Sequence, residues 1–492
     1  MMKRILSLML CILMLTSAFL FSGCKKEEEE TAETTASTVA GEEGITFAER
    51  NYEGAEYRVL CTTQVDDYYV TPEDTKTVIN EAVYNRNNDV QNKYGVTLSF
   101  NPLEGRSAGR DAFASEIRVS SQNEAYDLII GQSYYTMAMA LEGMYYNFND
   151  SEYLHLDQPW WDKELINDTV DIGGKLYAAS GSFVVSQVTT MMGLYFNKTM
   201  YNEKQLSSFV EGEDIYQLVR DGGWTYEIME KMVNSIYEDT NHNEQYDNVD
   251  VYGFVGNTHK SMCAMVGSDT PIVDKDDEGN MSISGYYDTH LVDVFDTYLK
   301  FFKENNHVFH TASDESVIEY FANSQALFGC MAVEYLASGT VRDSGIDYGI
   351  LPYPKYDELQ ESYYTNSLRW EIAHIPATAD VEKACIVFEY LNYSTYNNFI
   401  PQYYETVLST QAIQAPEDAE MLALIRSTVR FDFATFYQSQ IGNSYSDNIY
   451  IGVKTLIERG DSGISSWWDS NKQLYENKLE ELVDLYLYYL EA

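Results

Sequence analysis

Short, mostly apolar runs alternate with longer amphipathic segments in the first part of the chain. Short runs rich in β-branched and aromatic residues are typical of buried strands, and apolar residues at helical spacing are typical of helices. Gly95 follows the first helical segment, where glycine often ends a helix. The predicted strands and helices are, in order, 57–60, 74–93, 96–100, 111–120 and 126–130. This alternation predicts βα units around a largely parallel sheet.

A similar alternation resumes between Leu194 and Ala377, after a stretch rich in Trp, Tyr and Gly. A final helix is predicted over 471–491, because its leucines recur on one side of a helix. The 492 residues are enough for two or three domains. The pattern therefore predicts an α/β protein with more than one domain.

The N-terminus has the pattern of an export signal. Basic residues precede an uncharged apolar run, and small residues stand just before Cys24. This predicts a signal peptide over 1–23. A retained transmembrane helix is the alternative, since the apolar run is close to the shortest length that spans a bilayer. The polar segment 24–45 that follows is typical of a flexible tether, which favours cleavage.

The residues before Cys24 resemble a bacterial lipobox, Leu20-Phe21-Ser22-Gly23-Cys24. They depart from that pattern at Phe21, where an aliphatic residue is usual. The resemblance implies cleavage before Cys24, a fatty acid such as palmitate on that cysteine, and anchoring to the outer face of the cell membrane.

The chain is strongly acidic, with a formal net charge of −45. Nucleic acids and anionic lipid headgroups bind through basic patches, so both are poor partners for this chain. Its 42 Tyr and 6 Trp residues offer flat apolar faces with a polar edge, which suit carbohydrate rings as well as ordinary packing.

Four cysteines follow the predicted lipidation site, far apart and without metal-binding spacing. One or two disulfides are an alternative to free thiols. Buried free thiols are expected, because a chain of this length builds a core without covalent links. The four are Cys61, Cys263, Cys330 and Cys385.

Several segments resemble the family 1 extracellular solute-binding proteins of ABC importers, the group that includes maltose-binding protein. Their order and spacing extend over nearly all of the chain after the tether. They are Tyr126 to Gly131, Gln158-Pro159-Trp160-Trp161-Asp162, Gly174 to Tyr177, Leu194-Tyr195-Phe196-Asn197-Lys198, Gly222 to Thr225, Phe321 to Phe328, Gly349 to Lys355, and Pro401 to Glu405.

This resemblance implies a two-lobe, periplasmic-binding-protein-like α/β fold with hinge strands and an interlobe cleft. The chain is expected to cross between lobes near 182–194, 370–375 and 396–404. The implied domains are lobe I, from 46–185 plus 370–398, and lobe II, from 186–369 plus 399–492.

The resemblance also implies capture of a mono- or oligosaccharide and its delivery to the transmembrane subunits of an ABC permease. The protein is expected to act as a monomer that needs no cofactor. A peptide or another polar metabolite is the alternative solute. A cell-surface glycan-degrading enzyme is a more distant alternative, since acidic pairs for glycoside hydrolysis occur by chance in so acidic a chain.

Trp370 and Glu371 are the leading candidates for ligand contact, because they fall at an expected crossing between lobes. An aromatic ring beside a carboxylate can stack on a sugar and accept its hydroxyl hydrogens. Loops that follow predicted strands give further candidates, since open α/β sheets bind ligands at strand ends. These candidates are Gln64, Asp66, Asp67, Tyr68, Gly131, Gln132, Ser133, Tyr134, Glu334 and Tyr335.

Three other tryptophans have two interpretations. Trp160 and Trp161 follow a proline in a loop near the expected cleft, and Trp224 follows a Gly-Gly pair at a helix start. Each can stack on a sugar or can fill the core of a lobe. Trp161 and Trp224 are kept as ligand candidates, although core packing is favoured for both.

The segment 239–250 places oxygen-bearing side chains in the order of an EF-hand calcium loop. It departs from that loop at Glu244, where glycine usually makes the turn. A structural calcium site and an ordinary Asn/Asp-rich turn are both open. The candidate ligands are Asp239, Asn241, Asn243, Gln245 and Asp250.

Overall fold

The computed structural model describes residues 45–63, 66–71, 75–105, 109–257, 259–276, 279–283, 289–337, 339–367, 371–404, 413–444 and 446–491. The predicted signal peptide, Cys24 and nearly all of the tether lie outside these residues. Among the helices of the described ranges, none is both long and apolar enough to cross a membrane.

The first sheet has four strands in the order β12-β3-β1-β2. β1 (Ala55–Thr62) runs parallel to both β2 (Val96–Leu103) and β3 (Leu128–Gln132). β12 (Glu371–His374) is antiparallel to β3 and comes from a distant part of the chain. The predicted parallel strands are therefore confirmed, with one antiparallel strand added at the edge.

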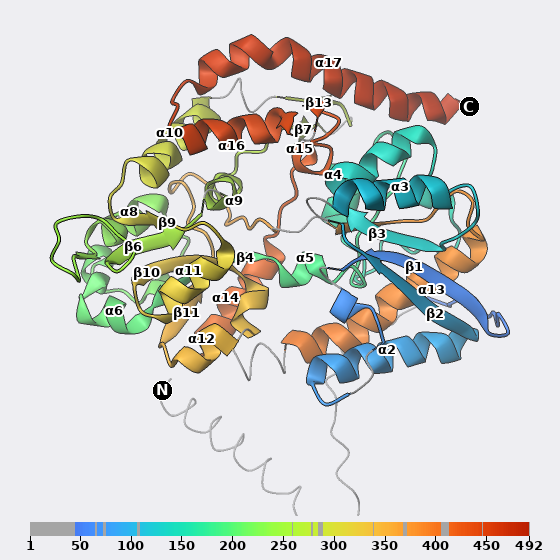
Figure 1. Cartoon of the computed structure of the whole chain (residues 1–492), viewed down its shortest axis with the longest axis horizontal. Helices are drawn as coiled ribbons and strands as arrows, with labels where there is room; N and C mark the ends of the chain where they lie inside the picture. The colour runs from blue at the N-terminus through green and yellow to red at the C-terminus, as the bar shows by residue number, and fades with distance from the viewer. Residues whose placement is uncertain are drawn as a thin grey trace, which may run out of the picture. The chain divides into compact units, whose positions relative to one another are not determined.

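Helices cover this sheet, and α2 (Val78–Tyr94) packs against α13 (Val381–Ser394) (Figure 1). Gly95 caps α2 in the left-handed conformation, with φ of 60°, as the sequence predicted. We call this sheet and its helices lobe I. Its other helical elements are η1 (Asp66–Tyr68), α3 (Arg110–Ser120), α4 (Ser133–Thr136), η3 (Met137–Glu142), η4 (Phe148–Asp150), η5 (Leu165–Val170) and η9 (Thr395–Phe399).

The second sheet follows the order β11-β4-β10-β6-β5, and β9 also pairs with β6. β10 is parallel to β6 and antiparallel to β4. We call this sheet and its helices lobe II. Its strands are β4 (Met192–Asn197), β5 (Tyr237–Glu238), β6 (Val251–Gly256), β9 (Val308–His310), β10 (Ala326–Ala332) and β11 (Tyr348–Leu351).

Lobe II is covered mainly by helices, and α14 (Pro416–Ser427) packs against β4 and β11. A small hairpin, β7 (Asp274–Lys275) with β8 (Met281–Ser282), lies outside the sheet. The other helical elements are α6 (Lys198–Glu203), η6 (Leu206–Val210), α7 (Ile215–Arg220), α8 (Tyr226–Asn234), α9 (His259–Gly267), α10 (Thr289–Lys303), α11 (Asp314–Ala322), η8 (Val333–Ala337) and α12 (Gly339–Ser344).

The C-terminal elements contact both lobes. α15 (Phe433–Phe436) packs against α4 and η5 of lobe I, whereas α16 (Ile449–Arg459) packs against α9 and α10 of lobe II. The strands β13 (Gly442–Ser444) and β14 (Asp447–Asn448) join α15 to α16, and α17 (Ile464–Glu491) ends the chain. Residues 433–459 thus contact both lobes, and the predicted domain boundaries stay a prediction.

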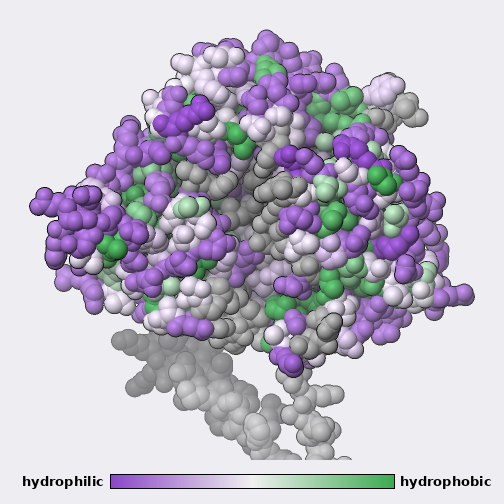
Figure 2. Space-filling view, viewed as in Figure 1, coloured by the Kyte–Doolittle hydropathy of each residue, from purple (hydrophilic) through white to green (hydrophobic). Residues whose placement is uncertain are grey.

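The cores are apolar, and the face in Figure 2 is largely hydrophilic, as expected for so acidic a chain. The four cysteines after the tether are all free and buried. Burial raises the pKa of the Cys263 and Cys385 thiols to about 11, which keeps them protonated. The prediction of buried free thiols is confirmed.

Candidate functional site

The chain passes between the two lobes in three places: over 182–192, between β11 and β12, and between η9 and α14. The short helix α5 (Ser186–Thr189) lies in the first of these crossings. The second crossing ends at Glu371, the first residue of β12. A backbone bridge between Met191 and Ser367 brings the first two crossings side by side. Side chains from these crossings can therefore act together.

Glu371 is the centre of a polar cluster at this point, and it is fully buried. Its Oε1 accepts hydrogen bonds from Gln132 Nε2 at 3.0 Å and from Thr62 Oγ1 at 3.4 Å. Its backbone carbonyl accepts a hydrogen bond from Gln187 Nε2 at 2.6 Å. The cluster joins the ends of β1, β3 and β12 to α5. We call these four residues the hinge junction.

The hinge junction has acceptors that the protein does not use. Glu371 Oε2 and Gln187 Oε1 are buried and have no hydrogen-bond partner among the described residues. The nearby hydroxyls of Ser133, Ser186 and Thr189 are also buried and have no hydrogen-bond partner in the described part of the chain. Buried polar atoms in proteins are nearly always hydrogen-bonded, so this concentration points to a bound polar molecule or water.

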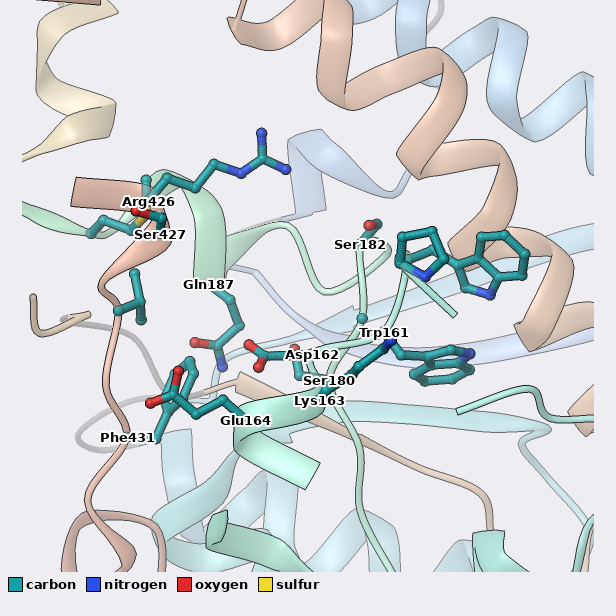
Figure 3. Close-up of a pocket in the computed structure, with 15 residues that line it drawn as sticks. Trp161, Asp162, Lys163, Glu164, Ser180, Ser182, Gln187, Arg426, Ser427 and Phe431 are labelled. Carbon is teal, nitrogen blue, oxygen red and sulfur yellow. The ribbon is translucent and has the colours of Figure 1, made fainter. Parts of the chain in front are cut away.

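A cavity of about 380 Å³ adjoins the hinge junction at Gln187 (Figure 3). One wall comes from lobe I, in the loops 159–164 and 180–182. The opposite wall comes from the end of α14 and the residues after it, Arg426, Ser427, Val429 and Phe431. Because both lobes contribute to it, a movement at the crossings would open or close this cavity.

Acidic side chains give the lobe I wall its electrostatic character. Burial raises the pKa of Asp162 to about 6, although the backbone N–H of Leu165 opposes this by donating to the carboxylate. Burial also raises the pKa of Glu164. Figure 3 shows the Asp162, Glu164 and Gln187 side chains converging on the same space. These groups present hydrogen-bond acceptors to the cavity.

Trp160 and Trp161 belong to the wall, but their rings serve the core. Both are 4% exposed, and their indole N–H groups donate to Glu389 Oε1 and Oε2 at 3.0 and 2.9 Å. Figure 3 shows the Trp161 ring directed away from Gln187. The Trp161 ring therefore packs in lobe I, the favoured interpretation of this residue, and its contact with ligand stays an untested prediction.

Trp224 is also a core residue, as favoured from the sequence, and its contact with ligand stays an untested prediction. It is fully buried in lobe II, where its indole N–H donates to the carbonyl of Pro352 at 3.1 Å. Its ring lies 6.0 Å from that of Phe328 on β10. An aromatic residue at a helix start has the same local sequence pattern in a core as in a cleft.

Other predicted contacts lie near the third crossing. Tyr68 meets the rings of Phe399 and Tyr403 at 6.2 and 6.4 Å. The pKa of Tyr403 is raised by burial, then by Tyr68 and Tyr404, and further by the Glu334 carboxylate. Tyr68 of lobe I and Glu334 of lobe II are thus brought to one place, around Tyr403.

The remaining candidates are more scattered. Tyr134 is buried beside Tyr135, with ring centroids 5.1 Å apart. Asp67 is exposed in η1. Gln64 and Trp370 lie outside the described residues. Two of the predicted contacts, Gln132 and Glu371, are hydrogen-bonded to each other.

The segment 239–250 forms a turn that its own side chains stabilise. Asp239 accepts backbone N–H bonds from Asn243 and Glu244. Asp250 is fully buried and accepts from the backbone N–H of Thr240 and Asp247 and from Tyr237. The described residues contain no group of three or more His, Cys, Asp or Glu side chains placed to hold a metal. The side-chain oxygens of Asp239, Asn241, Asn243 and Asp250 all accept hydrogen bonds within the turn, and calcium binding there stays a prediction.

Sequence reasoning missed Thr62, Gln187 and Glu389. The only signal for Gln187 was its place in the expected crossing 182–194. Thr62 directly follows the predicted first strand and Cys61, where strand ends face ligands in α/β proteins. Glu389 lies within a helix and had no local signal.

No protein-family model matches the sequence, and no curated protein matches it. Solved structures do match. The maltose-binding periplasmic protein MalE from Listeria monocytogenes, in complex with maltose, has a TM-score of 0.55 at 12% identity over 87% of this chain and 98% of that chain. An ABC substrate-binding protein from Listeria monocytogenes, in complex with cycloalternan, has a TM-score of 0.53 at 9% identity. The match covers 86% of this chain and 98% of that chain.

A third similar structure is the maltose/maltodextrin-binding domain MalE from Bdellovibrio bacteriovorus, bound to maltotriose. It has a TM-score of 0.51 at 10% identity, over 87% of this chain and 100% of that chain. Likeness at such low identity bears on the fold alone. The chain therefore has the two-lobe α/β fold of ABC substrate-binding proteins, as its sequence predicted.

Proposed function

We propose that the protein is the extracytoplasmic binding subunit of an ABC importer, which captures a mono- or oligosaccharide between its lobes and delivers it to a membrane permease. The fold supports this function. The similar structures are binding proteins in complex with maltose, maltotriose and cycloalternan. All three ligands are carbohydrates with many hydroxyl groups.

One observation carries the proposal: unused buried acceptors adjoin a cavity that both lobes line. Glu371 Oε2 and Gln187 Oε1 have no partner among the described residues, and Gln187 also lines the cavity. Sugar hydroxyls can donate to such oxygens. Desolvated acceptors of this kind favour a ligand that satisfies them over one that leaves them unpaired.

The proposed anchor is lipid on Cys24, joined to the lobes by the tether 24–45. A flexible tether keeps a receptor at high effective concentration near a permease in the same membrane. Membrane fractionation of cells that express Cys24→Ala tests this part. We expect the variant to leave the membrane fraction; retention there would support an uncleaved apolar helix instead.

A thermal-shift screen of the full chain tests the binding function. The probes are maltose, maltotriose, cycloalternan and common monosaccharides, with di- and tripeptides as a second arm. A sugar at 100 times its Kd should stabilise the protein by about 2.7 kcal/mol, which raises the melting temperature clearly. Stabilisation by peptides alone, or by no probe, would contradict the sugar assignment. Formation of new reducing ends would instead indicate an enzyme.

A further inference from the structure

We infer that Gln187 is a specificity-determining residue of the interlobe cavity, and that it selects a neutral, hydroxyl-bearing ligand. In this role Gln187 Oε1 accepts a hydrogen bond from a ligand hydroxyl while Nε2 holds the second crossing in place. The inference rests on the proposed function, because it takes the cavity between the lobes to be the sugar site.

The orientation of the Gln187 amide follows from its partner. The atom 2.6 Å away is the backbone carbonyl oxygen of Glu371, which can only accept a hydrogen bond. The amide nitrogen must therefore face Glu371, and Oε1 must face the other way. Gln187 is 6% exposed, and its Oε1 has no partner within the described ranges. The side chain consequently presents a fixed, desolvated acceptor.

The Gln187 side chain lines the cavity. Figure 3 shows the Gln187 side chain extending from α5 toward Asp162, with Glu164 and Phe431 beyond it. A ligand in the cavity would therefore meet the amide oxygen together with carboxylate oxygens. Groups of this kind favour hydrogen-bond donors, and they disfavour a carboxylate or phosphate on the ligand.

Two cations also line the cavity, Lys163 and Arg426. Both side chains are exposed, so water and salt screen their attraction for an anion. The acceptors of Gln187 and Asp162 are more deeply placed, where electrostatic interactions are stronger. The balance therefore favours a neutral sugar over a sugar acid or a sugar phosphate.

Gln187 also links ligand contact to the crossings. It lies in the first crossing, and Glu371 begins the strand that ends the second. The bond between them joins residues 184 positions apart in sequence. A ligand that bonds to Oε1 restrains the same side chain that holds the crossings together. Ligand binding and hinge geometry are coupled through one amide group.

The test compares Gln187→Leu with wild type by titration calorimetry, using maltotriose, its monodeoxy analogues and glucose 6-phosphate. Leucine removes both the acceptor and the donor at similar size. Gln187→Glu is a second variant that keeps an acceptor but loses the donor to Glu371. Gln473→Leu, an exposed glutamine on α17, is the matched control. Urea unfolding of each protein establishes that it is folded.

We expect Gln187→Leu to bind maltotriose at least about 10-fold more weakly than wild type and Gln473→Leu to bind it unchanged. In wild type, removal of one particular hydroxyl from maltotriose should weaken binding about 10-fold. The same removal should weaken binding to Gln187→Leu less than 2-fold. A purely structural role would not produce this loss of hydroxyl dependence. The affinity of Gln187→Glu should still depend in part on that hydroxyl, because glutamate keeps an acceptor.

The outcomes separate the two proposals. If maltotriose and the other neutral sugars of the screen fail to bind wild type, the proposed function and this inference both fall. If they bind wild type and Gln187→Leu equally, only the inference falls. Tighter binding of glucose 6-phosphate than of neutral sugars would also overturn it, because a buried acceptor cannot select an anion.

Discussion

Two buried glutamates of lobe I differ in how fully the protein satisfies them. Glu389 accepts four hydrogen bonds, from the indole N–H groups of Trp160 and Trp161 and from the backbone and ring nitrogens of His155. We call these residues the Glu389 cluster. Glu371 is buried to the same degree, but only one of its carboxylate oxygens has partners among the described residues.

This contrast separates a structural carboxylate from a candidate binding group. A buried carboxylate with both oxygens bonded fixes the groups around it, and here it holds the cavity wall from behind. A buried carboxylate with an unused oxygen costs free energy unless another molecule completes its bonding. Burial alone does not distinguish the two glutamates. Their hydrogen-bond partners do.

The largest expected effect is a difference in the free energy of unfolding between glutamine variants of the two glutamates. Glu389→Gln places an amide N–H₂ against indole and imidazole donors, so we expect a loss of about 3 kcal/mol in the free energy of unfolding. Glu371→Gln faces fewer donors and should lose less than about 1 kcal/mol. Urea unfolding of both variants measures this. Equal losses would show that the two sites do not differ as described.

A smaller effect on stability is expected from Phe47, which packs on the aromatic rings around the Glu389 cluster. Phe47 lies against the rings of Tyr393, Tyr390 and Trp160, at 4.7, 5.1 and 6.1 Å. Phe47→Ala should cost about 1–2 kcal/mol, because the ring is only partly buried. It should also speed hydrogen exchange at the Trp160 indole, measured by NMR. Phe209→Ala, at a residue 39% exposed, is the control and should change neither quantity.

Asp162, on the lobe I wall of the cavity, should make the free energy of unfolding depend on pH. Burial raises its pKa from 3.8 to about 6 in the folded protein. The folded state therefore binds a proton more tightly than the unfolded state between these values. Stability from this group is present below pH 3.8 and is lost as pH rises through about 6.

Asp162→Asn should remove this dependence and stabilise the protein by roughly 1 kcal/mol at pH 7 relative to wild type. Asparagine keeps an acceptor for the backbone N–H of Leu165. Urea unfolding at several values between pH 4 and 7 measures the effect, with the exposed Asp293→Asn as control. A pH profile unchanged from wild type would show that Asp162 is not protonated as described.

The smallest expected effect concerns the turn 239–250. Its oxygens already bond to the protein, so calcium at millimolar concentration should raise the melting temperature by no more than about 1 °C. Thermal unfolding with and without calcium tests this. A rise of several degrees that Asp239→Ala abolishes would establish a calcium site.

Local pattern was enough to predict much of lobe I. The strand predicted over 57–60 is the centre of β1, and the helix predicted over 74–93 corresponds to α2, with Gly95 at its end. These elements depend on alternation, helical periodicity and one glycine, all of which the sequence contains. Boundaries differ by a few residues, because ends depend on caps and tertiary contacts.

The site was less predictable, because its bonds join distant residues. Gln187 bonds to a residue 184 positions away, and Trp161 bonds to one 228 positions away. Neither separation leaves a local pattern. Glu371 could be named because it stands at an expected crossing. Trp224 had two interpretations, because core and cleft aromatics share local sequence patterns.

The most direct test of ligand binding at the hinge junction is a crystal structure of the protein with the sugar that stabilises it most in the thermal-shift screen. We expect the sugar in the cavity between the lobes, with a hydroxyl within about 3 Å of Gln187 Oε1 or Glu371 Oε2. A sugar bound elsewhere, with both oxygens still unpaired, would contradict the claim that the hinge junction is completed by ligand.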